Sequence, residues 1–353
     1  MFLFLKNIQI LTLSQPAYKK HFAMDIDFVI TWVDMNDPKW QDSFAKSSGK
    51  IDNTKNEVSV ARFRDYGFLK YWFRGVEKFA PWVRKIHFVT CGQQPEWMNV
   101  SHPKLQLVSH EDYMPKQFLP CFNSNVIEAY MHRITDLTEH FVYFNDDFFI
   151  TNHITPGRFF TGNLPNDIAA FRMNFGFSLW NKCLRNNIRI INKRFNKKEV
   201  MERDHGKWFT EAYGKRARLT RLLKSYNKFV TLRTPHNAQP YTKTTFEEVW
   251  DYAGKELTEM SHHQFRSPKD YTLELFKTWQ ICRGNFAPYN TYNNTKMFPL
   301  VFKSAKAIKA VREQSYLLVC LNDSEYIMNF EKTMQGLQAA FESILPEKSS
   351  FES

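Results

Sequence analysis

The sequence predicts an α/β fold in which helices cover a mostly parallel, Rossmann-like sheet. β-branched and aromatic runs at residues 26–34, 83–90 and 105–109 alternate with stretches whose apolar residues recur every three or four positions. Strands that alternate with helices in this way form largely parallel sheets with covering helices. Of the 353 residues, 43% are hydrophobic and 16% aromatic, which is enough to bury the core of such a fold.

The first predicted strand, residues 26–34, ends at Asp34, just before the turn sequence Asn36-Asp37-Pro38. Asp34 therefore stands at a strand end, where it either caps the turn or binds a ligand. Trp32, two residues earlier, suits either the core or a platform on which a nucleotide base stacks. The strand alone leaves both pairs of alternatives open.

A helix is predicted to begin at Arg62-Phe63-Arg64-Asp65, because apolar residues recur at positions 69, 72, 73, 76 and 80 before Pro81 ends the pattern. Backbone N–H groups and the helix dipole favour an anion at such a start, and arginines add bidentate contacts. Arg62, Arg64 and Asp65 are therefore candidates for binding an anionic ligand, with a surface ion pair as the alternative.

A second helix is predicted at residues 123–134, with apolar residues at 126, 127, 130, 131 and 134. Asn125 and Glu128 have the spacing of a capping box, so a structural role is available to Glu128. Arg133 is within reach of a ligand from this helix, but a solvated position is the simpler interpretation.

Residues 141–144 form a predicted buried strand that runs into Asn145-Asp146-Asp147 and then back into two phenylalanines. Adjacent carboxylates repel each other unless a cation or hydrogen bonds offset the repulsion. The carboxyl ends of strands in open α/β sheets are also where ligands bind. A divalent metal that holds a diphosphate explains the triplet, and so does a turn or helix cap in which the side chains accept from backbone N–H groups.

The last third of the chain adds three polar candidates. His236 follows Pro235 in a predicted turn, which suits a general base, although a lone loop histidine usually belongs to the polar surface. Asn322 and Asp323 follow the apolar run 316–321 and place another acid at a strand end.

Residues 172–228 contain 16 Lys/Arg and four Asp/Glu, a surplus of +12 that equals the net charge of the whole chain. The local surplus predicts a largely helical, basic insertion with a face for a polyanion or an anionic membrane, and solvated helix faces are the alternative. Nucleic acid is excluded as a predicted partner, because no zinc-finger, RNP or basic-zipper pattern is present.

We expect residues 1–24 to form an N-terminal extension and residues 25–353 a single domain that carries the insertion. The extension is a poor secretory signal, because Lys6 interrupts its apolar start. It either lies on a membrane surface or precedes a true start at Met24. The five cysteines form no C-x-x-C pair, which predicts a reducing cytoplasm with no zinc site or disulfide framework.

Four segments in order resemble the signature segments of the Stealth family of sugar-1-phosphate transferases. That family includes bacterial capsule phosphotransferases and the lysosomal-enzyme N-acetylglucosamine-1-phosphotransferase. The segments are residues 27–40 (DFVITWVDMNDPKW), 62–149 (RFRDYGFLKYWF to HFVYFNDDFF), 234–270 (TPHNAQP to SHHQFRSPKD) and 320–351 (CLNDSE to LPEKSSF). They cover about half of the chain. Arg64 stands where some relatives have an acid, and the basic insertion lies outside the match.

The resemblance implies a GT-A-like sheet and a phosphotransferase of capsular or exopolysaccharide synthesis. Such an enzyme moves a hexose-1-phosphate, for example an N-acetylhexosamine-1-phosphate, from a UDP-sugar to a glycan hydroxyl and forms a phosphodiester. The implied partners are a nucleotide-sugar donor and a glycan acceptor that is itself polyanionic. From the cysteines and the basic insertion, we expect a cytoplasmic location with peripheral contact at the inner face of an anionic membrane.

The resemblance also implies roles for individual residues. Mg²⁺, with Mn²⁺ as the alternative, would be held by Asp146, Asp147 and Asp323. His236 would be the general base, and the other catalytic positions are Asp34, Asp65 and Arg266. The implied substrate-binding residues are Trp32, Arg62, Arg64, Asn125, Glu128, Arg133, Asn145 and Asn322.

Two other functions fit the sequence. A metal-dependent GT-A-like glycosyltransferase would share the sheet and the bound nucleotide but release a nucleoside diphosphate. A non-catalytic protein that binds a polyanion or a membrane through residues 172–228 would tolerate loss of the strand-end acids. The nucleotide that is released separates the first function from phosphotransfer. No oligomeric state follows from the sequence.

Overall fold

The computed structural model describes residues 24–49, 67–323, 326–327 and 329–353. The predictions made for residues 1–23 and for Arg62, Arg64 and Asp65 lie outside this described part of the chain. The division into an extension and one domain stays a prediction.

The central sheet has five strands in the order β3-β2-β1-β4-β8. Its first four strands run parallel, and β8 pairs antiparallel with β4 at one edge. The predicted α/β class and mostly parallel sheet are therefore confirmed. The strands are β1 (Ile26–Thr31), β2 (Ile86–Thr90), β3 (Leu105–Ser109), β4 (His140–Phe144) and β8 (Gln239–Thr242).

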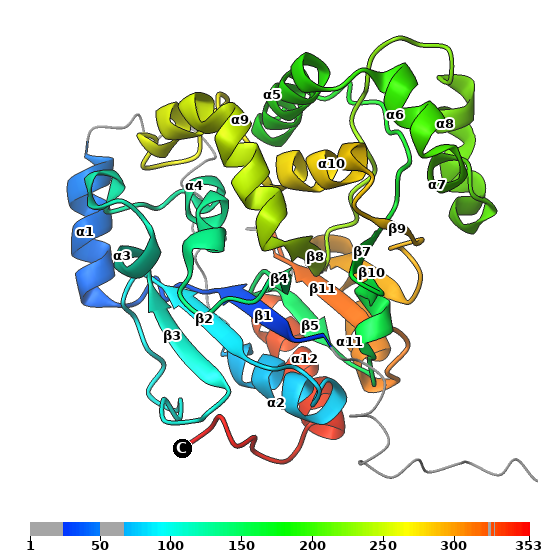
Figure 1. The fold of residues 1–353 in the computed structure, drawn as a ribbon. Coiled ribbons are helices and arrows are strands. Elements are labelled where there is room, and N and C mark those ends of the chain that lie inside the picture. Colours follow the sequence, from blue (N-terminus) through cyan, green and yellow to red (C-terminus); the bar gives the residue numbers. More distant parts are fainter. Residues whose placement is uncertain (1–23, 50–66, 324–325, 328) are drawn as a thin grey trace, which may run out of the picture.

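Helices cover both faces of this sheet (Figure 1). Successive strand residues point to opposite faces, so Phe28 and Phe144 join one hydrophobic cluster while Val29 and Tyr143 join another. The first cluster includes α2 (Leu69–Phe79) and α12 (Phe330–Ile344), and the second includes α4 (Ser124–Ala129), α9 (Lys243–Ser261) and α10 (Leu273–Arg283).

A second, three-stranded sheet brings the C-terminal third of the chain to the end of β4. It consists of β10 (Thr295–Pro299), β11 (Leu318–Asn322) and β5 (Phe148–Ile150), and β11 runs antiparallel to β5. The Leu321 N–H donates to the Asp147 carbonyl at 2.9 Å. The end of β11 therefore lies beside the Asn145-Asp146-Asp147 segment.

Several of the remaining elements belong to the insertion. The predicted helical character of residues 172–228 is confirmed, and its apolar residues join the cluster of α9 and α10. The insertion contains α5 (Leu179–Arg194), α6 (Lys197–Arg203), α7 (His205–Trp208), a 3-10 segment (Glu211–Ala217) and α8 (Arg218–Leu222). Elsewhere lie α1 (Pro38–Ser48), α3 (His110–Tyr113), α11 (Leu300–Arg312), β6 (Phe160–Thr161), β7 (Leu164–Asp167) and β9 (Ala287–Pro288).

One local prediction is wrong. Asn123, not Asn125, is the N-cap of α4, because its side chain accepts from the Asn125 N–H at 3.1 Å. The helix ends at Ala129 and is followed by a 3-10 turn. Glu128 is therefore not the acid of a capping box, and its carboxyl group has other contacts, which are described below. In the described part of the chain, no helix combines the length and the apolar character needed to cross a bilayer.

Candidate active site

The candidate site lies at one edge of the central sheet, where polar segments adjoin the ends of several strands. β1 and β4 are parallel and in register, with Ile30 opposite Phe144, so their carboxyl ends meet. β8 is antiparallel to β4, which brings the segment before Gln239 to the same edge. The carboxyl edge of such a sheet is the usual place for ligands. The segments that converge here contain Trp32–Asp34, Asn145–Asp147, His236 and Asn322–Asp323.

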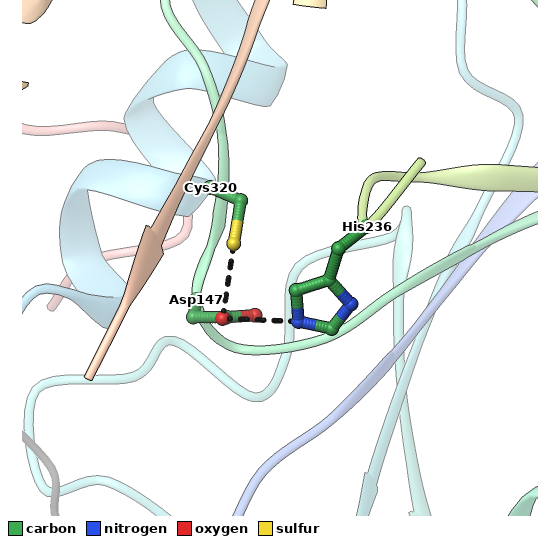
Figure 2. A group of neighbouring side chains, drawn as sticks. All are labelled: Asp147, His236 and Cys320. Carbon is green, nitrogen blue, oxygen red and sulfur yellow. Dashed lines mark hydrogen bonds and ion pairs between the residues drawn. The ribbon is translucent and has the colours of Figure 1, made fainter. Parts of the chain in front are cut away.

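Asp147 is the centre of a three-residue cluster (Figure 2). The Cys320 thiol donates to Asp147 Oδ2 at 3.2 Å, and His236 Nε2 lies 3.5 Å from the same oxygen. The edge-on ring of Phe148, 4.8 Å from the imidazole centroid, supports His236. The imidazole is 42% exposed and the Asp147 side chain 23%, so solvent and ligands can reach both.

The electrostatics of the cluster raise the pKa values of both the histidine and the thiol. Burial by itself lowers the pKa of His236, but the hydrogen bond and charge of Asp147, together with Glu274 and Glu128, raise it above its ordinary value. Burial and the neighbouring Asp147 raise the pKa of Cys320 well above that of a free thiol. Cys320 is therefore a hydrogen-bond donor to Asp147 and not a thiolate nucleophile.

Next to this cluster is a cleft of about 150 Å³. Glu128 lies in its wall and accepts a hydrogen bond from the Tyr143 hydroxyl at 3.0 Å, and that hydroxyl lies 2.9 Å from Thr31 Oγ1. Burial raises the pKa of Glu128 to about 7, although the charge of Arg266 opposes the shift. Five predicted site residues line the cleft: Trp32, Glu128, Asn145, Asp146 and Arg266.

Aromatic rings form a large part of the cleft wall. Trp40, Phe122 and Phe265 all line it. Phe122 and Phe265 stack with their centroids 5.3 Å apart. Arg266 Nη2, beside Phe265, donates to Ser124 Oγ at 2.5 Å, so the guanidinium is held at the cleft. Acids, an arginine and stacked rings in one cleft can accommodate a ligand that carries both phosphate and a planar base.

Three predicted binding residues in the described part of the chain do not line this cleft: Asn322, at the end of β11, and two residues in or near α4. The buried Asn125 amide donates to Asp270 Oδ2 at 3.1 Å. The guanidinium of Arg133 lies over the rings of Tyr130 and Trp250, 4.9 and 5.4 Å from their centroids. None of the three is among the described residues that line the cleft.

Asp34 follows β1 and shapes the turn there. Its Oδ1 accepts from the Asn36 N–H at 2.8 Å, and the Gln93 side chain bonds the Asp34 backbone on both sides, at 2.9 and 2.7 Å. One carboxylate oxygen therefore has the turn-capping role that the sequence left open. The sequence does not predict this role of Gln93, because a single glutamine between two turns matches no motif for a binding or capping residue.

Two further residues of the site were missed. Cys320 lies in β11, and only the pairing of β11 with β5 brings it to Asp147, 173 positions away. Glu274 accepts a hydrogen bond from the Thr272 hydroxyl, and burial raises its pKa. Its charge acts on His236. The sequence contains one signal for Glu274: it is a glutamate among the apolar residues of the first turn of α10, where an acid is expected to be buried.

The cluster offers ligand atoms for a divalent metal. One atom each from Asp147, His236 and Cys320 lies within 4.8 Å of the other two. Asp147 Oδ1 is buried and has no hydrogen-bond partner among the described residues, which leaves a hard oxygen available to a cation. The protonated sulfur of Cys320 does not suit Mg²⁺, which prefers oxygen ligands. The register of β11 places Asp323 near the same segment.

Comparisons with known proteins identify relatives over almost the whole chain. Residues 62–167 match the Stealth protein CR2, conserved region 2, and residues 24–52 match the Stealth protein CR1, conserved region 1. The capsular polysaccharide phosphotransferase WcwK of Streptococcus pneumoniae is 39% identical over 93% of this chain and 98% of its own length. The exopolysaccharide phosphotransferase cps2G of Lactiplantibacillus plantarum is 35% identical over 93% and 96%.

The receptor polysaccharide phosphotransferase WefC of Streptococcus oralis is 36% identical over 93% of this chain and 99% of its own length. Among solved structures, the galactosyltransferase LgtC in complex with donor and acceptor sugar analogues is 10% identical, covers 90% of this chain and 96% of its own, and has a TM-score of 0.39. Mouse xyloside xylosyltransferase 1 is 8% identical over 85% and 98%, with a TM-score of 0.34.

Proposed function

The chain belongs to the Stealth family and is a phosphotransferase, and we propose that it transfers a hexose-1-phosphate from a UDP-sugar to a glycan hydroxyl in capsular or exopolysaccharide synthesis. The observation that carries this proposal is the strand-end cluster in which Asp147 faces His236 beside a cleft with a buried acid and an arginine. Phosphoryl transfer of this kind depends on positioning and charge neutralisation, which such a cluster supplies.

His236 is the proposed general base. Asp147 Oδ2 faces its Nε2 and holds the Nε2–H tautomer, so that Nδ1 carries the lone pair. The acceptor hydroxyl oxygen attacks the phosphorus that bears the sugar while Nδ1 takes the hydroxyl proton. The phosphoanhydride bond then breaks, a phosphodiester is formed, and UMP leaves with the bridging oxygen.

Oxygens of Asp146, Asp147 and Asp323 would hold Mg²⁺ or Mn²⁺. Such a cation, when bound, neutralises charge on the diphosphate. Arg266 would add bidentate contacts to the phosphate oxygens.

The remaining predicted residues have proposed roles in binding. Trp32, Asn145 and Asn322 would contact the donor. Arg62, Arg64, Asp34 and Asp65 would position donor or acceptor. Asn125 would act indirectly: with Asn123 it donates to Asp270, and Asp270 accepts from the Ser267 N–H and pairs with His263, so these contacts hold the loop that presents Arg266. Arg133, on its two rings, would stabilise the same side of the fold.

The acceptor is proposed to be an anionic glycan held by a groove in the insertion. This cationic groove, of about 910 Å³, lies between the end of α5, α6 and residues 224–228. Five cations and one acid line it, together with aromatic rings: Lys193, Arg194, Lys198, Lys224 and Lys228, and Glu202. Positive charge around rings suits a chain of sugars joined by phosphates. A cytoplasmic location with contact to the inner face of an anionic membrane completes the proposal.

The experiment is to incubate the protein with Mg²⁺, a capsule-type oligosaccharide and a panel of UDP-sugars, and to identify the nucleotide released. UMP together with a phosphodiester product supports the proposal. Release of UDP would assign the chain to the glycosyltransferases. No turnover with any donor, and unchanged polyanion binding by an Asp147→Asn variant, would favour a non-catalytic binding protein.

A further inference from the structure

Three large aromatic side chains are exposed on one short segment, residues 172–180, which we call the aromatic loop. Phe175 is 76% exposed, Phe177 86% and Trp180 44%. Large exposed rings that gather in this way on a protein surface mark an interaction surface, because burial of their apolar area is more favourable than its exposure to water. The rings do not line the active-site cleft or the cationic groove, as far as the described residues define these two sites.

The backbone of the aromatic loop is held in place while its rings point away. Arg185 Nη1 donates to the Gly176 carbonyl at 2.8 Å, and the Asn174 amide donates to the Asn181 carbonyl at 2.9 Å. Gly176 lies so close to Asn181 that an added Cβ would be 2.1 Å from its side-chain nitrogen. These contacts hold the backbone that carries the two exposed phenylalanines, one on each side of Gly176.

The aromatic loop is connected to the segments that carry two proposed catalytic residues. The Arg172 N–H donates to the Thr231 carbonyl at 2.7 Å, five positions before His236. At the other end, the Cys183 thiol donates to the Ser267 carbonyl at 3.4 Å, next to Arg266. A partner bound by the aromatic loop is therefore held by the same framework as the active site.

The sequence around the rings is rich in positive charge. Residues 168–198 contain eight Lys/Arg and no Asp or Glu. Arg172, the first residue of the loop, and Lys182, just after its end, are both exposed. Phenylalanine and tryptophan enter the headgroup region of a bilayer, and lysine and arginine nearby are attracted by anionic lipids at about 1 kcal/mol each. A glycan partner would instead favour rings that line a groove, as in the two sites above.

We propose that the aromatic loop docks on an anionic lipid bilayer, with Phe175, Phe177 and Trp180 in the headgroup region and Arg172 and Lys182 against lipid phosphates. The inference deepens the proposed function by naming the surface that would present the active site to an acceptor at the membrane. The docking itself needs no catalytic step, so it can be tested apart from transfer.

The experiment measures co-sedimentation of the full chain with vesicles of 70% phosphatidylcholine and 30% phosphatidylglycerol, and with pure phosphatidylcholine. We expect the wild type to bind the anionic vesicles, more weakly at 1 M than at 0.1 M salt, since the Debye length falls from ~10 Å to ~3 Å. The double variant Phe175→Ser/Phe177→Ser should bind at least about ten-fold more weakly. The matched control is Phe302→Ser on α11, where the ring is 85% exposed, and it should bind as the wild type does.

Transfer to a soluble oligosaccharide acceptor is measured on the same proteins. An unchanged transfer rate in the double variant, with lost vesicle binding, supports docking. Vesicle binding by the double variant equal to the wild type overturns it. A fall in soluble transfer without vesicle binding by any of the proteins also overturns it and assigns the rings to the glycan. Vesicle binding is scored even if no donor is turned over, so failure of the proposed function would be recognised separately.

Discussion

The active-site cleft and the basic insertion use charge in opposite ways. In and beside the cleft, carboxylates are few and held: Asp147 lies between Cys320 and His236, and Glu128 accepts from Tyr143. In the insertion, cations are many and loosely paired. Lys193, 66% exposed, lies 3.8 Å from an acid. Held charges, which are buried and hydrogen-bonded, acquire shifted pKa values and a defined geometry. Solvated charges instead contribute an electrostatic field that salt screens.

Lys197 is a buried, firmly held cation within the insertion. It is only 2% exposed, and its ammonium donates to the carbonyls of Leu223, Lys224 and Tyr226 at 2.8, 3.0 and 2.7 Å. Burial lowers its pKa. It therefore belongs with the held charges, and its function is to fix one wall of the cationic groove.

The largest effect on activity is expected at Asp147, the centre of the strand-end cluster. Asp147→Ala should abolish transfer while the protein stays folded, because a lost metal ligand removes several kcal/mol of transition-state stabilisation. Activity with Mg²⁺ and circular dichroism measure the two parts. Asp42→Ala, at an exposed acid on α1, is the matched control and should change neither. Near-normal turnover of Asp147→Ala would contradict the assignment of Asp147 to the active site. Loss of folding would instead indicate that Asp147 has only a structural, capping role.

His236→Ala should lower kcat by ~10²–10⁴-fold with little change in donor affinity, as expected for loss of a general base. Steady-state kinetics gives the rate, and calorimetry with the UDP-sugar gives the affinity. If affinity falls in step with kcat, His236 is a donor ligand and the base lies elsewhere, at Asp34 or Asp65.

Glu128 should make stability depend on pH. Its folded pKa of about 7 lies above the ordinary glutamate pKa of 4.5, so the unfolded state releases the proton more readily. Stability is therefore lost as pH rises from the lower to the higher value, by at most about 3 kcal/mol. Glu128→Gln should remove this loss, so that its advantage over wild type is larger at pH 8 than at pH 5 in urea unfolding. An advantage that is the same at both pH values would contradict a buried, protonated Glu128.

Lys197 and Lys198 are neighbours in the chain, but Lys197 is buried and hydrogen-bonded whereas Lys198 is solvated. Replacement of each lysine in turn therefore compares a held charge with a solvated one. Lys197→Ala leaves three carbonyls without their donor and should cost about 1–3 kcal/mol of unfolding free energy. Lys198→Ala removes a side chain that is 82% exposed and should cost close to zero. Thermal and urea unfolding check both. Equal losses in the two variants would show that Lys197 is not a held charge.

The smallest effect per residue is expected in the cationic groove. Replacement of Lys193, Arg194 and Lys198 by Ser, with Lys197 left in place, should shorten the products at low salt while the rate of a single transfer is unchanged, since each exposed cation contributes under about 1 kcal/mol. The product-length distribution on long and one-repeat acceptors is the measurement. Unchanged lengths with reduced binding to anionic vesicles would assign these cations to the membrane.

Much of the fold could be predicted because its signals are local. The strand that precedes Asn145-Asp146-Asp147 and the basic composition of residues 172–228 depend on neighbouring residues in the chain. The start of α4 is predicted to within a residue, but its cap is not: Asn123 and Asn125 are both good N-cap residues, and only the folded backbone brings the Asn123 side chain to the Asn125 N–H.

The sequence by itself determined which acids stand at strand ends, because alternation and turn residues place a strand's end to within a few positions. It also determined that the positive charge is confined to one region. Only the tertiary structure decided which of these groups meet. Cys320 and His236 reach Asp147 through pairings between strands far apart in the chain, and Glu128 and Lys197 acquire their roles from burial. Desolvation and hydrogen-bond geometry depend on distances in space, which no short stretch of sequence contains.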